Sequence, residues 1–279
     1  MNSGAQIMSN IGQFQYGQLL FNPAYSGSST SLRAQLIHRN QFVKTDGSPS
    51  YQYLLVDAPI SSKWGLGGAA EMKRTGKLRE ITVSANPSYR IKFDKKSFLQ
   101  FGMRVAASRF SNNLTDAFVW DDNDEIISSF NSGTVFRLGT GVFYKLGKIY
   151  MGLSSPDLLN VDPNKVFYDD ETNETSLGSN VVFNTGIEIF INEFTTLLPN
   201  VMLRYYSNRP LNYYLNMGVE LNQTVIVGFS VVDPMAYGFY TRISVSPKVK
   251  VGYHYEFGMN SHELSPFHTN ELTLAYGFE

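Results

Sequence analysis

The end of the chain, residues 271–279, alternates between apolar side chains and polar or small ones. The apolar set comprises Leu272, Leu274, Tyr276 and Phe278. Because successive side chains of an extended strand point to opposite faces, this pattern predicts a strand with one apolar face. The same alternation recurs along almost the whole sequence. A closed barrel in a lipid bilayer requires it, since its outside faces hydrocarbon and its inside faces water.

The composition favours a barrel over a helical membrane protein. The 279 residues contain no stretch that approaches the roughly 18 uncharged apolar residues of a spanning helix. The mean hydropathy is −0.18, as expected when half of each strand is polar. The chain has 17 tyrosines and 20 phenylalanines, which suits aromatic girdles at the membrane interfaces. The net charge of −1 gives no electrostatic basis for binding nucleic acid, and the lack of cysteine excludes disulfides.

The sequence therefore predicts an all-β fold, a transmembrane antiparallel β-barrel of the outer-membrane type with about 14 strands. The barrel is expected to occupy residues 30–279. The predicted strands span residues 30–44, 50–60, 64–75, 78–93, 97–112, 134–146, 148–154, 180–192, 196–207, 211–222, 223–233, 235–246, 248–258 and 269–279.

The alternation also predicts which side chains face lipid. In the strand at 248–258, Val251 and Tyr253 share one face, whereas Lys250 and His254 share the other. A charge turned toward the middle of the bilayer would cost about 2–4 kcal/mol, so the apolar face is expected to point outward.

The connections between strands predict how the barrel is oriented. The links after even-numbered strands are short, whereas the three long ones, residues 113–133, 155–179 and 259–268, all follow odd-numbered strands. Outer-membrane barrels have short periplasmic turns and longer extracellular loops. Both termini are therefore expected in the periplasm of a bacterial outer membrane.

Residues 1–29 do not continue the alternation and form a separate predicted unit. Residues 1–6 lack the basic start and the apolar run of a signal peptide, so we expect the sequence to be that of a processed chain. A barrel of this size has room inside, and we expect this unit to plug the periplasmic mouth; the alternative is a disordered leader. The turn-forming residues predicted to make up the plug motif are Phe21, Asn22, Pro23, Ala24, Tyr25 and Gly27.

Charged side chains at lumen-facing positions form the first candidate site. If they pair with one another and with Glu220, they fill the interior; if they are unpaired, they line an anion-preferring channel. The predicted lumen set is Arg33, Arg39, Arg104, Arg137, Arg204, Arg242, Lys250, His254 and Glu256.

The long external loops form the second candidate site. Residues 152–159 read Gly-Leu-Ser-Ser-Pro-Asp-Leu-Leu and place two leucines beyond a predicted strand end. Exposed apolar residues suggest contact with a partner, although they could also tuck under the loop as a lid. The predicted partner-binding residues are Pro156, Asp157, Leu158, Leu159, Asp169, Asp170 and Glu171.

Enzymatic and metal sites receive little support from the sequence. His262 and His268 lie near serines in the last long loop, but no nucleophile-elbow motif is present, and we expect no enzymatic activity. The run Asp121–Glu125 could supply oxygen ligands to Ca²⁺, but it lacks the glycine and the distal glutamate of an EF-hand loop. A solvated acidic loop is the alternative, and no other cofactor is expected.

Several segments, in this order, resemble the PorP/SprF family from about residue 20 to the end. They are FNPAYSGS, LRAQLIHRNQFV, YQYLLVDAPI, WGLGGAAEMKRTG, VFRLGTGVFYKLGKIYMGLSSPDLL, VMLRYYSNRPLNYYLNMGVELNQTVIVGFSV, VKVGYHYEF and NELTLAYGF. The resemblance implies an outer-membrane component of the type IX secretion system of Bacteroidetes, tied in some members to gliding motility. It also implies two kinds of partner: a secreted, adhesin-like surface protein bound through its C-terminal domain, and other components such as the translocon and periplasmic lipoproteins.

The expected function is therefore to bind the C-terminal domain of a secreted surface protein and to support its export and cell-surface anchoring. Two alternatives remain open. One is an outer-membrane diffusion channel for small hydrophobic or anionic solutes. The other concerns the fold, because a soluble β-sandwich could show the same alternation.

Overall fold

The structure is a computed structural model. It describes residues 11–43, 46–112, 133–161, 176–177, 180–207, 210–232, 236–258 and 268–278. Within these residues no helix is long and apolar enough to cross a membrane.

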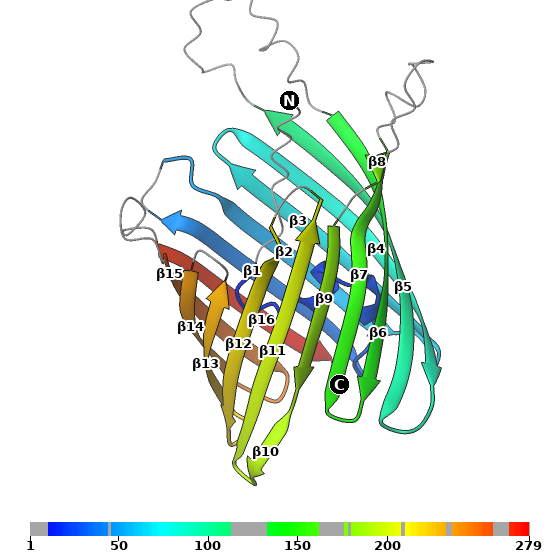
Figure 1. The fold of residues 1–279 in the computed structure, drawn as a ribbon, viewed down its shortest axis with the longest axis vertical. Coiled ribbons are helices and arrows are strands. Elements are labelled where there is room, and N and C mark those ends of the chain that lie inside the picture. The colour runs from blue at the N-terminus through cyan, green and yellow to red at the C-terminus, as the bar shows by residue number, and fades with distance from the viewer. Residues whose placement is uncertain are drawn as a thin grey trace, which may run out of the picture.

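The described chain forms one antiparallel sheet that closes on itself (Figure 1). The first strand pairs with the last, with Leu36 opposite Leu274. The segments are β1 (Leu32–Val43), β2 (Ser50–Pro59), β3 (Trp64–Thr75), β4 (Leu78–Lys92), β5 (Ser97–Asn112), β6 (Gly133–Leu146), β7 (Ile149–Val161), β8 (Ser176–Leu177), β9 (Asn180–Ile187), β10 (Ile189–Asn192), β11 (Thr195–Tyr206), β12 (Asn212–Leu221), β13 (Val225–Val232), β14 (Ala236–Ser244), β15 (Val249–Gly258) and β16 (His268–Phe278). Because β8, β9 and β10 follow one another in a single wall position, the barrel has 14 strands, which confirms the predicted fold class.

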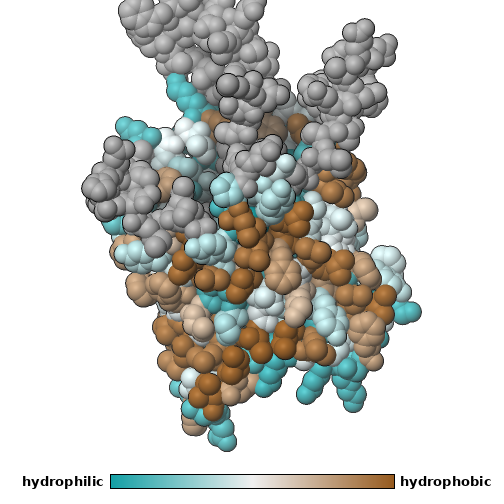
Figure 2. All heavy atoms as spheres, in the orientation of Figure 1, coloured by the Kyte–Doolittle hydropathy of each residue, from teal (hydrophilic) through white to brown (hydrophobic). Residues whose placement is uncertain are grey.

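The two faces of the wall differ as the alternation predicts. On the outside, Tyr253 is 40% exposed and Leu274 is 45% exposed, whereas on the inside His254 and Glu271 are completely buried. Figure 2 shows apolar side chains over the middle of the wall, with hydrophilic ones gathered at its lower end. An outward apolar band around a polar interior is the arrangement that a bilayer requires.

The barrel has a short-turn end and a long-loop end, as the lengths of the connections predict. The short-turn end carries compact links such as the one between β12 and β13, where Asn222 and Gln223 have φ values of 51° and 55°. Two consecutive left-handed residues make a type I′ hairpin, whose twist matches that of the strands. At the opposite end, residues 113–132, 162–175 and 259–267 lie outside the described residues.

The predicted end of one strand is wrong. The strand expected at 148–154 is β7, which continues to Val161. A proline usually indicates an edge or a break in a strand, but here a bulge accommodates Pro156, and the pairing with β6 shifts register between Leu138 and Thr140. Residues 156–159 therefore belong to the barrel wall and not to an external loop.

Residues 11–31, called the inner segment below, lie inside the barrel (dark blue in Figure 1). They contain two short 3₁₀ helices, η1 (Gln18–Leu20) and η2 (Pro23–Tyr25). Ile11, Phe14 and Leu20 are almost completely buried and pack with side chains of β1, β2, β11 and β12. The apolar core of the molecule is therefore built between the inner segment and the inside of the wall.

Candidate functional site: the barrel interior

The turn motif of the inner segment is held by its asparagine. The side-chain Oδ1 of Asn22 accepts a hydrogen bond of 2.9 Å from the backbone N–H of Ala24 and so caps η2, in which Pro23 takes the first position. The side-chain Nδ2 of Asn22 donates a bond of 3.0 Å to the carbonyl oxygen of Val142 in β6. One buried side chain thus forms the local turn and fastens it to the wall.

Glycines of the wall provide the space that this motif occupies. A Cβ atom added at Gly102 in β5 would lie 2.2 Å from the backbone nitrogen of Ala24. A Cβ atom added at Gly141 in β6 would lie 2.2 Å from Oδ1 of Asn22. The strands and the inner segment approach so closely that only a residue without a side chain fits at either position.

The end of the motif is attached to β2. Gly27 has a φ of +64°, in the left-handed region, and its N–H donates a 2.9 Å bond to the carboxylate of Asp57. The same carboxylate pairs with Arg33 at 2.9 Å. The guanidinium of Arg33 in turn lies over the ring of Tyr25, 5.0 Å from its centroid.

The start of the inner segment is attached to β16, which lies on the other side of β1 from β2. The backbone N–H groups of Gly12 and Gln13 donate to the carboxylate of Glu271 at 2.7 and 3.1 Å. Arg39 pairs with Glu271 at 3.2 Å and forms a two-pronged pair with Glu256 at 2.9 and 2.6 Å. The side chains of these three residues are at most 4% exposed. Buried charges persist when each has hydrogen-bonding partners, as here.

A second group of ion pairs lies on the inner face of the wall and joins strands β3 to β6. Arg104 pairs with Glu71 at 2.6 Å, Arg137 pairs with Glu80 at 2.8 Å, and Lys73 lies 3.4 Å from Glu71. The sequence analysis predicted Arg104 and Arg137 but not their partners. The residues that it missed are Glu71, Lys73 and Glu80, together with Asp57 and Glu271. Their alternation with outward apolar neighbours, such as Ile81 after Glu80, was the signal that could have found them.

One buried chain of polar groups has the order found in hydrolases. Ser230 Oγ lies 2.7 Å from His254 Nε2, and His254 Nδ1 lies 3.3 Å from Glu256. Ser230 and His254 have no exposed surface, and a Cβ atom at Gly12 would lie 1.9 Å from the His254 ring. Because a nucleophile must reach its substrate, this arrangement supports the inner segment and does not act as a catalytic site.

Arg204 and Arg242 also contact aromatic rings. Arg204 lies between the rings of Phe21 and Tyr206, at 5.6 and 4.8 Å from their centroids. Arg242 lies 4.1 Å from the centroid of the Tyr16 ring. Within the described residues, Arg242 and Lys250 form no ion pair.

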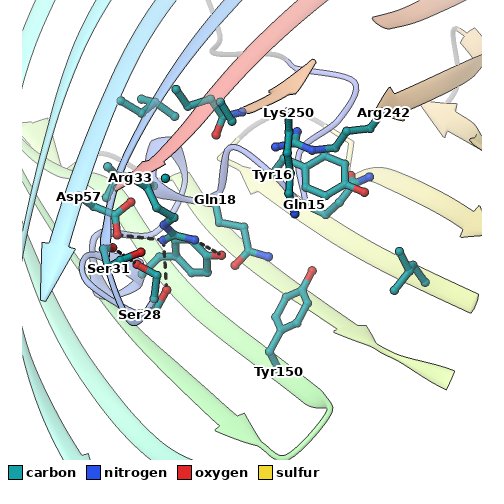
Figure 3. A pocket seen from close by; sticks show the side chains of 18 of the residues that line it. Gln15, Tyr16, Gln18, Ser28, Ser31, Arg33, Asp57, Tyr150, Arg242 and Lys250 are labelled. Carbon is teal, nitrogen blue, oxygen red and sulfur yellow. Dashed lines mark hydrogen bonds and ion pairs between the residues drawn. The ribbon is translucent and has the colours of Figure 1, made fainter. Parts of the chain in front are cut away.

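The structure thus places the whole predicted lumen set on the inside of the wall, where its members fall into a paired group and an unpaired group. Most members are paired with carboxylates. Arg242 and Lys250 instead line a cavity of about 580 Å³ at the short-turn end (Figure 3), which the inner segment bounds from within. Paired and unpaired charges therefore both occur inside the barrel, and whether the unpaired ones select anions stays a prediction.

The predicted partner-binding residues are only partly described. Pro156 is buried and Asp157 is half-buried, whereas Leu158 is 36% exposed at the far end of β7. Several candidate residues fall outside the described residues: Asp169, Asp170, Glu171, the acidic run at 121–125 and His262. Among the residues that are described, no group of three or more His, Asp or Glu side chains could hold a metal ion.

Comparisons with known proteins agree with this architecture. A family model described as "Type IX secretion system membrane protein PorP/SprF" matches residues 3–276. The chain matches none of the curated proteins with which it was compared.

Solved outer-membrane barrels share the fold at low sequence identity. The P. putida toluene transporter TodX has a TM-score of 0.55 at 8% identity, over 94% of each chain. The CymD monoaromatic hydrocarbon channel has a TM-score of 0.54 at 12% identity, over 97% of this chain and 94% of the other. The Acinetobacter baumannii outer membrane protein Omp33 has a TM-score of 0.52 at 10% identity, over 91% of this chain and 100% of the other. At such identities the likeness shows the fold alone.

Proposed function

Because the chain belongs to the PorP/SprF family of type IX secretion system membrane proteins, we propose that this outer-membrane barrel binds the C-terminal domain of a secreted surface protein. The barrel then supports export of that protein and anchors it at the cell surface. Membership of the family also implies association with other components of the secretion system.

The observation that carries this proposal is the filled interior. The inner segment is fastened to β16 through Glu271 and to β6 through Asn22, two strands on opposite sides of the barrel. A barrel whose middle is packed with buried side chains has its free surface at the two ends. Such a barrel is suited to docking a protein at its rim and loops.

The two ends differ in the surface that they offer. We assign the short-turn end to the periplasm and the long-loop end to the cell surface, following the usual asymmetry of outer-membrane barrels. The exposed Leu158 lies toward the long-loop end of β7, and the acidic residues 169–171 follow it in the sequence. This region is the proposed docking surface for the secreted protein.

Deletion of residues 162–175 tests the proposal without cutting β7, which ends at Val161. The variant is expected to lose capture of a secreted C-terminal domain in a pull-down from detergent-solubilised membranes. Deletion of residues 113–132, the loop between β5 and β6, is the matched control and should retain capture. Full capture by the 162–175 deletion would contradict the proposed docking surface.

A diffusion channel is the second candidate, because the same fold serves as a channel in the solved neighbours described as a toluene transporter and a monoaromatic hydrocarbon channel. A channel needs a continuous path, whereas the inner segment occupies the middle of this barrel. Recordings in planar bilayers separate the two functions. The filled barrel is expected to show no steady conductance, and a stable open level in the intact protein would favour the channel.

A further inference from the structure

The cavity at the short-turn end is a site with an excess of positive charge. Six basic residues and three acidic residues line it, which leaves a surplus of three positive charges. The basic residues are Arg33, Lys145, Lys148, Arg242, Lys248 and Lys250. The acidic residues are Asp57, Glu188 and Glu220, and the first of these is already paired with Arg33.

Arg242 is the most unusual of these groups. Its side chain is nearly buried, with 6% exposure for the residue, and its Nη1 has no hydrogen-bond acceptor among the described residues. Its close neighbour is the ring of Tyr16, whose phenol is uncharged at neutral pH. A buried guanidinium without a carboxylate is costly, and an incoming anion would relieve that cost.

The basic groups are spread over opposing walls of the cavity. Lys145 comes from β6, whereas Arg242 and Lys250 come from β14 and β15, on the other side of the barrel. Figure 3 shows Arg242 and Lys250 beside Tyr16, with Arg33 and Tyr150 on other sides of the same space. Because the basic groups come from opposing walls, the arrangement suits a ligand with several separated negative charges.

The other lining groups suit a polypeptide. The rings of Tyr25, Tyr150 and Phe143 offer flat apolar surface, and Gln15 and Gln18 offer amides that can hydrogen-bond to a backbone. A cavity of about 580 Å³ lies within the usual range of roughly 300–1,000 Å³ for ligand pockets. Residues 1–10 of the chain contain no acidic side chain and cannot supply the charge themselves.

We propose that this cavity binds an acidic peptide segment of a partner protein, which enters from the short-turn end. The site goes beyond the docking surface proposed above, because it lies at the opposite end of the barrel and uses different residues. The proposed docking surface and the proposed peptide site can therefore be tested independently.

Binding of a defined peptide to the detergent-solubilised full chain tests the inference. The probe is an acetylated nine-residue peptide with four glutamates, and the matched peptide carries four glutamines. Isothermal titration should show binding of the glutamate peptide that weakens as salt is added, because exposed charges are screened. The glutamine peptide should bind at least tenfold more weakly.

Variants locate the binding within the barrel. R242Q and the double variant K248Q/K250Q should each weaken binding of the glutamate peptide by roughly tenfold, as expected for one or two lost ion pairs. Lys248 and Lys250 are exposed, so the double variant remains informative if R242Q fails to fold. R74Q/K95Q removes the same charge from exposed positions that do not line the cavity and should bind like the unaltered protein.

Three results would overturn the inference. They are equal binding of the two peptides, no loss of binding in K248Q/K250Q, and binding of inorganic phosphate without binding of the peptide, which would indicate a site for a free anion. Deletion of residues 162–175 should leave peptide binding unchanged. The outcome at the cavity is therefore distinguishable from failure of the docking surface at the other end.

Discussion

At the scale of single residues, the interior depends on a few side chains that each serve two contacts. Asn22 both caps η2 and donates to Val142 of β6. Glu271 accepts from two backbone N–H groups and also pairs with Arg39. Because a buried polar group left without its partner costs about 1–3 kcal/mol, such residues fix the position of the inner segment more firmly than apolar packing alone would.

The wall glycines allow a direct test of this fit. Gly102→Ala places a Cβ atom 2.2 Å from the backbone nitrogen of Ala24 and should destabilise the barrel by about 1–3 kcal/mol through overpacking. Gly68→Ala is the matched control, since its Cβ atom would approach the carbonyl oxygen of Ser84 only to 3.6 Å. Urea unfolding in lipid vesicles measures both variants. Equal midpoints would show that the inner segment yields at little cost.

At the scale of elements, the inner segment is held inside the barrel by contacts near both of its ends. Its attachments reach β2, β6 and β16, and its apolar residues supply much of the buried core. The strands themselves are joined by a continuous ladder from β1 to β16. The wall therefore does not need the inner segment for closure, although it needs it to fill the interior.

Deletion of residues 1–31 is expected to leave a closed barrel with an open path. The variant should keep the heat-dependent mobility shift on gels that is typical of folded barrels, and it should conduct in planar bilayers. The open interior would expose lumen charges such as Arg39 and Arg104, both of which are buried in the intact chain. A deletion variant that folds but stays silent would mean that another part of the chain closes the lumen.

Alternation predicts most elements of the wall because one of its faces must be apolar. The predicted strand at 64–75 coincides with β3, and that at 97–112 coincides with β5. Alternation did not predict where β7 ends, because the bulge around Pro156 interrupts the pattern. Ion pairs such as Arg104 with Glu71 depend on register between strands, and a single sequence does not show register directly.

At the scale of the whole molecule, the apolar band outside and the charged network inside fix the same register. Shifting one strand by a single residue would turn inward groups such as Glu271 toward lipid and outward groups such as Leu272 inward. Because each strand of the closed wall pairs with a neighbour on either side, such a shift would also disturb the register of the adjacent strands. The free-energy cost of a register shift is therefore high at every position of the wall.

The depth of a charge on the outer face should decide its effect on stability. Leu274→Arg, in the middle of the wall, is expected to destabilise the barrel by about 2–4 kcal/mol, whereas Leu32→Arg, where β1 begins at the short-turn end, should cost about 0–1 kcal/mol. Both leucines are exposed on the outside in the present structure. Reversible unfolding in vesicles gives the two free energies. Equal costs would place the membrane band elsewhere on the wall.

The position of the Arg39 cluster has a consequence for sideways release of material into the bilayer. Arg39 lies on β1, Glu271 on β16 and Glu256 on β15, so the cluster crosses the seam at which the cylinder closes. Parting these strands would break backbone pairing and separate the buried guanidinium of Arg39 from both of its carboxylate partners. Opening a lateral gate between the first and last strands would therefore carry the cost of breaking this buried cluster.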